Sequence, residues 1–211
     1  MIPDLQELLY ALAPLVALTN PVAEIPIFLA IVAGQSTRSQ RAAAAETAFG
    51  VWLVLTAAVL LGRPLLASMG ISLAAFRAAG GLLLALMGLE MTRGEEPALQ
   101  SAATGQDEAK DRLWIPLVMP LLAGPGAIVT AISLSFRESA DRSVPVATLI
   151  AVALSAVVVL MVLLSGPFLL QRSSLRTRRI LTRFSGLVLV AIGFQMGFTS
   201  IAEFFNIAAL P

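Results

Sequence analysis

Six long apolar stretches constrain the fold of this chain more than any other feature of its sequence. They lie at approximately Leu8–Val32, Ala44–Leu66, Ile71–Met91, Trp114–Phe136, Val144–Leu170 and Phe184–Phe205. A bilayer core about 30 Å thick takes roughly 20 apolar residues per helix, so each stretch is long enough to cross it. The chain is also 58% hydrophobic and only 13% charged, unlike a soluble domain. We therefore expect an all-α integral membrane protein with six transmembrane helices.

The basic residues lie unevenly on the two sides of these stretches. Four of the 14 Lys and Arg residues would lie on one side, and the remaining ten on the other. Those four are Arg63, Arg77, Arg137 and Arg142. By the positive-inside rule, both termini lie outside and the basic loop "RSSLRTRR" (172–179) faces the cytoplasm. This distribution predicts a multi-pass membrane protein with both termini outside.

The composition also excludes several classes of function. The chain contains no histidine and no cysteine, which removes thiolate and histidine metal sites and a Ser-His-Asp triad. No nucleophile–base pair is visible either, so we do not expect an enzyme. We expect no metal, no cofactor and no nucleic-acid partner. The expected partners are a small-molecule substrate and membrane lipids, and the sequence leaves open whether copies of the chain associate.

The two halves of the chain resemble each other at a nearly constant spacing. Gly81 and Gly88 align with Gly186 and Gly193, which follow them by 105 residues. Two other pairs of segments match in the same order: "LLGRPLL" with "LLSGPFL", and "NPVAEIP" with "MPLLAGP". Shared apolar composition is the alternative explanation, but three ordered matches favour a duplication. Because each copy holds three helices, the second copy must enter the membrane from the opposite side, as in many secondary transporters.

This pattern predicts two inverted three-helix repeats joined by a polar segment. The expected units are repeat 1 (1–92), a cytoplasmic linker (93–113) and repeat 2 (114–211).

Prolines interrupt the first and fourth apolar stretches at corresponding positions. Pro21 and Pro26 remove backbone donors from the first stretch, and Pro120 and Pro125 do so in the fourth. The residue before each proline is also driven toward extended geometry. Unsatisfied backbone at membrane depth is tolerated only inside protein or beside a wet cavity. We predict that helices 1 and 4 are broken at these motifs, although a simple kink satisfied by neighbouring helices is the alternative for either one alone.

Glu24 lies inside the first of these interruptions. A carboxylate within the membrane is costly and suggests a functional role, either coupling to a proton or ion or pairing with a substrate ammonium group. The alternative is a structural glutamate bonded to freed backbone. The amide ends of the half-helices after Pro26 and Pro125 suit an anionic group. The predicted substrate-binding residues are Asn20, Pro21, Glu24, Pro26, Gly124, Pro125, Gly126 and Thr130.

Other polar residues have two interpretations each. Arg77 either extends toward the interface or pairs with Glu24 or a substrate carboxylate, and Glu90 and Gln195 either form symmetric gates or lie at the interfaces. Thr130 and Ser133 line a path or bond their own backbone.

Four blocks of the sequence resemble the MarC family of bacterial and archaeal inner-membrane proteins. They are "NPVAEIPIFLAI", "GISLAAFRAAGGLLLALMGLEM", "LVMPLLAGPGAI" and "GLVLVAIGFQM". The resemblance implies six helices with periplasmic termini, and some members are described as neutral amino-acid transporters driven by an ion or proton gradient. Many members have Asp-Pro at the first motif and an amide four residues later. Here Asn20 comes first and Glu24 second, which puts substrate and coupling ion in doubt.

These observations predict a secondary transporter of small zwitterions, with neutral amino acids as the expected class. The substrate would lie at the membrane midplane between broken helices 1 and 4, and Glu24 would couple transport to protons. A passive channel or exporter of the same architecture is one alternative. A structural or regulatory membrane protein, in which the interruptions are sealed and dry, is another.

Overall fold

The computed structural model describes residues 5–22, 24–32, 34–94, 118, 122–139, 145–172 and 175–205. Regular structure in these ranges is helical throughout. The helices are α1 (Leu5–Thr19), α2 (Ile25–Ile31), α3 (Thr37–Ser68), α4 (Leu73–Arg93), α6 (Pro125–Ser139), α7 (Val146–Arg172) and α8 (Leu175–Phe204). Most of the predicted linker 93–113 and the motif residue Pro120 lie outside the described residues.

Four helices of the described part are long and apolar enough to cross a membrane. They are α3, α4, the Val146–Gly166 part of α7 and the Thr182–Phe204 part of α8. The shorter apolar helix α1 precedes them, and α6 occupies the C-terminal part of the fourth predicted stretch. The predicted class, an all-helical membrane protein, is therefore confirmed.

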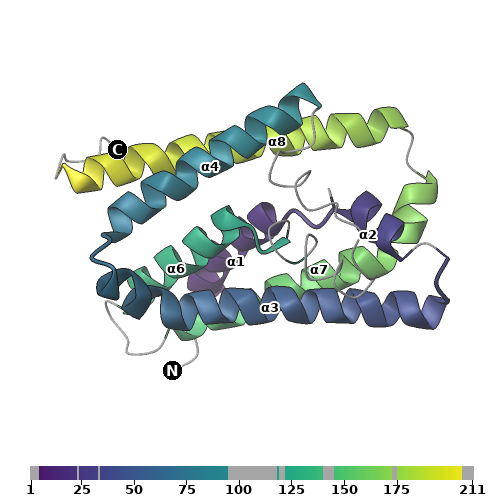
Figure 1. Ribbon diagram of the computed structural model, residues 1–211, viewed down its shortest axis with the longest axis horizontal. Coiled ribbons are helices and arrows are strands. Elements are labelled where there is room, and N and C mark those ends of the chain that lie inside the picture. Colours follow the sequence, from purple (N-terminus) through teal and green to yellow (C-terminus); the bar gives the residue numbers. More distant parts are fainter. Residues whose placement is uncertain are drawn as a thin grey trace.

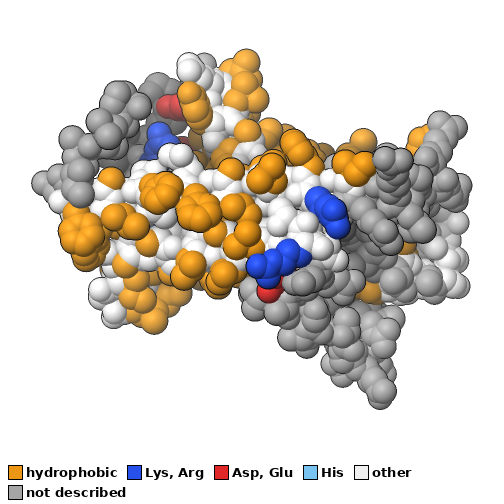
Figure 2. Space-filling model, turned by 90° about the horizontal axis from the view of Figure 1, so that it is seen from above, with side chains coloured by type: hydrophobic (Ala, Val, Ile, Leu, Met, Phe, Trp, Pro, Cys, Tyr) orange, Lys and Arg blue, Asp and Glu red, His pale blue; other side chains and the backbone are white. Residues whose placement is uncertain are grey.

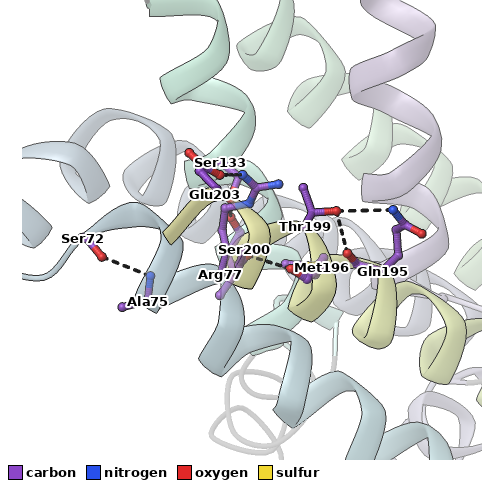
Figure 3. Close-up of polar contacts among 10 residues, drawn as sticks. Ser72, Ala75, Arg77, Ser133, Gln195, Met196, Thr199, Ser200 and Glu203 are labelled. Atoms are coloured by element: carbon purple, nitrogen blue, oxygen red, sulfur yellow. Dashed lines mark hydrogen bonds and ion pairs between the residues drawn. The ribbon is translucent and has the colours of Figure 1, made fainter. Parts of the chain in front are cut away.

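Local sequence signals fix where several helices begin and end. The hydroxyl of Ser72 accepts a hydrogen bond from the backbone N–H of Ala75 at 3.2 Å and so caps the start of α4 (Figure 3). Ser36 caps α3 in the same way, through the N–H of Ser39. Gly94 ends α4 with a φ of 82°, a left-handed conformation that glycine adopts without steric cost.

The basic segment near residue 175 differs from the prediction. The sequence suggested a loop over 172–179, but α7 continues to Arg172 and α8 already begins at Leu175. Arginine and leucine are both strong helix formers, so α8 already includes residues 175–179, although this stretch is too basic to lie in the bilayer. The predicted loop was therefore wrong, because helices continue beyond the apolar stretches. Helix α3 shows the same behaviour, since it begins at Thr37, several residues before its apolar stretch starts.

Helices α4 and α8 lie side by side along one edge of the molecule and run in opposite directions (Figure 1). This pair forms the most extensive helix contact, and α4 joins it to the rest of the protein through α6. On the other side, α1 and α3 both pack against α6 and α7, and α2 packs against α7. The buried core of the described part runs mainly through this second group, with Leu15, Leu55, Leu122, Val152 and Val159, and continues to Leu84 of α4 and Leu189 of α8.

One end of the bundle, here named the Glu7 end, gathers the starts of α1, α4 and α7 and the ends of α3, α6 and α8. Glu138 near the end of α6 accepts hydrogen bonds from the start of α7. The guanidinium of Arg63, near the end of α3, lies 5.2 Å from the centre of the Phe136 ring of α6.

Large apolar side chains cover much of the outer surface of the described part (Figure 2). On α8 they include Phe184, Leu187, Phe194, Phe198 and Ile201, each at least half exposed. A soluble monomer rarely presents so much contiguous apolar surface, whereas a helix that faces lipid does so along its length.

Candidate functional site

The first interruption lies between α1 and α2. Helix α1 ends at Thr19, and α2 begins only at Ile25. Asn20 has a φ of 35°, so it adopts a left-handed rather than the expected extended conformation. Asparagine is among the few residues that tolerate this region. Pro26 occupies the first turn of α2, where its missing N–H costs nothing, so the chain resumes its helix at this motif.

Glu24 immediately precedes α2 and is buried, with 5% of its surface exposed. Its backbone carbonyl accepts the N–H of Phe28 at 3.0 Å, the first hydrogen bond of the short helix. The neighbouring Thr19 and Ile25 are buried as well, and Ile25 packs beside Gly166 of α7. The carboxyl group therefore lies inside the protein, at the point where the helix is interrupted.

The second interruption precedes α6. The N–H of Ala123 bonds to the carbonyl of Val118, five residues earlier, at 2.8 Å, which is a wider turn than in an α-helix. Helix α6 then starts at Pro125, and the carbonyl of Gly124 accepts the N–H of Ile128 at 3.0 Å. Gly124 is buried. A new helix therefore begins at the matching proline of the second half, with its first turn inside the protein.

Helix packing accounts for Gly126. A Cβ atom at this position would overlap the side chain of Leu84, which lies on α4. Gly126 thus allows close approach of α4 and α6, which is a structural reason for the glycine apart from any ligand.

Thr130 and Ser133 lie further along α6, and both are buried. The hydroxyl of Thr130 lies 3.9 Å from the sulfur of Met196 on α8. The hydroxyl of Ser133 donates to the carbonyl of Val129 in its own helix at 2.7 Å, one of the two roles suggested by the sequence. Thr130 therefore faces the α8 side of the molecule.

Arg77 forms an ion pair with Glu203 rather than with the suggested Glu24. The Nη1 atom of Arg77 lies 3.0 Å from Oε2 of Glu203, which joins the start of α4 to the end of α8 (Figure 3). The two side chains are 20% and 53% exposed. Glu203 was not singled out from the sequence because no local signal links residues so far apart in the chain.

The structure does not bring Glu90 and Gln195 together. Gly88 packs against Gly186, whereas Gly193 packs against Gly81, so Glu90 and Gln195 lie at different levels of the α4–α8 pair. The amide of Gln195 instead donates to the hydroxyl of Thr199, one turn along α8 (Figure 3).

Sequence reasoning missed a cavity of about 240 Å³ at the Glu7 end. Helices α1, α6 and α7 line it with Glu7, Tyr10, Ala11, Leu134, Arg137, Glu138, Ala147 and Thr148. Nothing in the sequence places these residues together, because they meet only when the three helices pack.

Comparison with known proteins gives a consistent result along nearly the whole chain. Residues 5–205 match the model of the family described as MarC family integral membrane protein. A UPF0056 membrane protein of Methanocaldococcus jannaschii is 34% identical over 195 residues, covering 92% of this chain and 95% of that protein. A UPF0056 membrane protein of Pyrococcus abyssi is 33% identical, covering 92% and 93%. The UPF0056 membrane protein YhcE of Escherichia coli is 29% identical, covering 90% of each. No solved structure matches the chain.

Proposed function

The chain belongs to the MarC family of integral membrane proteins, as the sequence motifs indicated, and from this premise we propose that it is a secondary transporter of small zwitterionic solutes, with neutral amino acids as the class. The names of the relatives say only that they are membrane proteins, so the proposal depends on the geometry of this chain.

One observation carries the proposal: a buried glutamate lies where a membrane-embedded chain interrupts its helix. A carboxyl group and backbone N–H and C=O groups without helical partners both cost free energy in a membrane interior. Both cost less beside a hydrated site. In this chain they coincide, because Glu24 lies in the break between Thr19 and Ile25 and is 5% exposed. We assign Glu24 the binding of the coupling proton or of the substrate ammonium group.

The start of α6 is the proposed partner of Glu24. Its first N–H groups carry the positive end of the helix dipole, which suits the carboxylate of a zwitterion. Residues that flank the two interruptions, Leu18 and Phe28 on one side and Leu122 and Ala127 on the other, belong to the same buried core. This supports a substrate site near the midplane that both interruptions share.

Contacts between α4 and α8 support the inverted repeat that such a mechanism uses. The repeat pairs Gly81 with Gly186 and Gly88 with Gly193. A two-fold axis between the halves would therefore turn a contact between Gly81 and Gly193 into one between Gly186 and Gly88. Both contacts are present, backbone against backbone.

The proposal also includes the topology and location of the chain: six membrane spans, both termini outside, and a place in the inner membrane.

The test is uptake of labelled alanine, glycine and serine into proteoliposomes, with and without a pH gradient. We expect saturable uptake that the gradient drives above equilibrium. Glu24→Gln should retain exchange of substrate but lose the response to the gradient. Glu46→Gln, at a half-buried glutamate of α3, should behave as wild type. No specific flux across a broad panel of small solutes would refute the transporter, and uptake that is insensitive to the gradient would indicate a passive channel.

A further inference from the structure

We propose that the cavity at the Glu7 end is a vestibule that captures a zwitterionic amino acid before it reaches the deeper site, an inference that rests on the proposed function for the class of its ligand. The cavity of about 240 Å³ lies among the start of α1, the end of α6 and the start of α7. It is larger than one small amino acid, and none of its lining residues belongs to the site built around Glu24.

Opposite charges reach the cavity from different helices. Arg137 lies near the end of α6 and Glu7 near the start of α1, and both side chains line the cavity. Arg137 forms no ion pair with any residue in the described ranges. Its guanidinium is a fork of five N–H donors whose geometry matches a carboxylate. Arg137 is therefore the group that holds the carboxylate of the ligand.

The second carboxylate of the cavity has a structural role. Glu138 accepts hydrogen bonds from the N–H groups of Ala147 and Thr148 at 2.8 and 2.9 Å and from the Thr148 hydroxyl at 3.0 Å. Both of its oxygens thus hold the start of α7, and its charge complements the dipole of that helix. Glu138 stabilises the wall of the vestibule, and the ammonium-binding role falls to Glu7.

Glu7 and Tyr10 complete the vestibule from α1. A carboxylate offers about four acceptor positions, so Glu7 can receive an ammonium group in addition to another partner. Tyr10 lies about one helical turn further along α1, lines the cavity and is 68% exposed. Ala11 and Leu134 provide an apolar surface suited to a short aliphatic side chain. The arrangement favours a molecule with both charges and a small apolar part.

The single tyrosine of the chain makes the test direct. Tyr10 is the only tyrosine, so the full chain expressed with 3-fluorotyrosine in place of tyrosine gives one ¹⁹F resonance. The chemical shift of this resonance reports on the surroundings of Tyr10 in the vestibule. We expect L-alanine to shift it saturably in detergent or nanodiscs. Acetate and methylammonium, which each carry one of the two charges, should require much higher concentrations.

Three variants link the shift to the proposed contacts. Arg137→Gln and Glu7→Gln should each raise the half-saturating alanine concentration about fivefold, as expected for an exposed ionic contact. Arg137→Lys keeps the charge and should change it less. Arg63→Gln removes the same charge from the same end but outside the cavity lining, and should have no effect.

Two outcomes would overturn the vestibule: no alanine-dependent shift in the wild type, or an Arg137→Gln titration that matches that of Arg63→Gln. Either could occur while proteoliposomes still take up alanine, which would leave the proposed transport intact. A normal shift without any uptake would instead remove the transport proposal and leave a binding site.

Discussion

Gly81 on α4 and Gly193 on α8 face each other across the helix pair, each against the backbone of the other. A Cβ atom at Gly81 would lie 2.6 Å from the carbonyl oxygen of Gly193, and one at Gly193 would lie 2.5 Å from the carbonyl oxygen of Gly81. Gly88 and Gly186 repeat this relationship further along the pair. Small residues let membrane helices approach closely enough for their backbones to touch. Van der Waals packing at such contacts stabilises the helix pair, because the hydrophobic effect does not drive helices together within lipid.

These four residues, Gly81, Gly88, Gly186 and Gly193, form a glycine seam between α4 and α8. Adding a methyl group at any of them should separate the two helices. We expect Gly193→Ala to lower the melting temperature of the purified protein by roughly 3–8 °C, because overpacking costs about 1–3 kcal/mol. Gly197 is the matched control, since a Cβ there would meet nothing within 4 Å. Gly197→Ala should leave the melting temperature unchanged or raise it slightly. Equal losses from both variants would mean that the seam is not the reason for the glycines.

The ion pair between Arg77 and Glu203 should contribute little to stability. Both side chains are partly exposed, and pairs of this kind contribute about 0.2–1 kcal/mol. A double-mutant cycle with Arg77→Gln and Glu203→Gln, measured by chemical unfolding in detergent, gives the coupling energy. The exchange Arg77→Glu with Glu203→Arg should restore most of it. If Arg77→Gln alone abolished uptake while Glu203→Gln did not, Arg77 would have a role beyond this pair.

Glu138 should matter more, because three hydrogen bonds converge on it. We expect Glu138→Ala to cost about 1–2 kcal/mol of unfolding free energy, the range for loss of a charged helix cap. Thr148→Val removes only the hydroxyl bond and should cost less, about 0.5–1 kcal/mol. Thermal or denaturant unfolding followed by circular dichroism measures both. The same cost for the two variants would contradict the capping role of Glu138.

Transport should require movement between the α4–α8 pair and the remaining helices. Helix α8 packs extensively only against α4, and α4 reaches the others through α6. A disulfide between Gly80→Cys and Val129→Cys would fix α4 to α6, because the two positions face each other. A Cβ at Gly80 would lie 2.9 Å from that of Val129, which is closer than the roughly 3.5–4.5 Å of a disulfide, so the helices must separate slightly to admit the bond. Because the chain has no cysteine, the double variant forms one defined crosslink. We expect oxidation to block uptake and a reducing agent to restore it.

A second crosslink provides the control for this movement. Met91→Cys with Gly186→Cys would join α4 to α8, where the two Cβ positions would also be too close, 2.8 Å apart. Because the side chain at Gly186 itself disturbs the packing, uptake is compared between the reduced and oxidised forms of the same variant. This bond lies within the pair that we expect to move as a unit, so uptake should persist after oxidation. Loss of uptake from both crosslinks would show that the two helices also move against each other.

The sequence predicted the helices better than the contacts between them. Apolar length located α3, α4, α7 and α8, since a bilayer allows few alternatives to a long helix. The sequence aligned Gly81 with Gly186 and Gly88 with Gly193 as equivalent positions of a repeat, but it did not predict that these four glycines contact one another. Polar partners were harder to predict. Glu203, which pairs with Arg77, and Glu138, which caps α7, lie at helix ends whose neighbours depend on tertiary packing.

The interruptions illustrate the same limit at the candidate site. Proline chemistry located the positions where α2 and α6 begin, because a proline fits the first turn of a helix but not its interior. The left-handed conformation of Asn20 was not predicted, since the residue before a proline usually becomes extended. The overlap that a side chain at Gly126 would have with Leu84 also lay beyond local reasoning. That contact joins two helices from different halves of the chain.

The reciprocity of the glycine seam has a consequence for assembly. Gly81 and Gly88 of the first half meet Gly193 and Gly186 of the second, so each half contributes two glycines to the docking surface. Two fragments produced separately, one ending and one beginning between residues 95 and 117, should therefore find each other in a bilayer. On the proposed inverted repeat, a fragment carrying only one half should pair with its own duplicate in the opposite orientation.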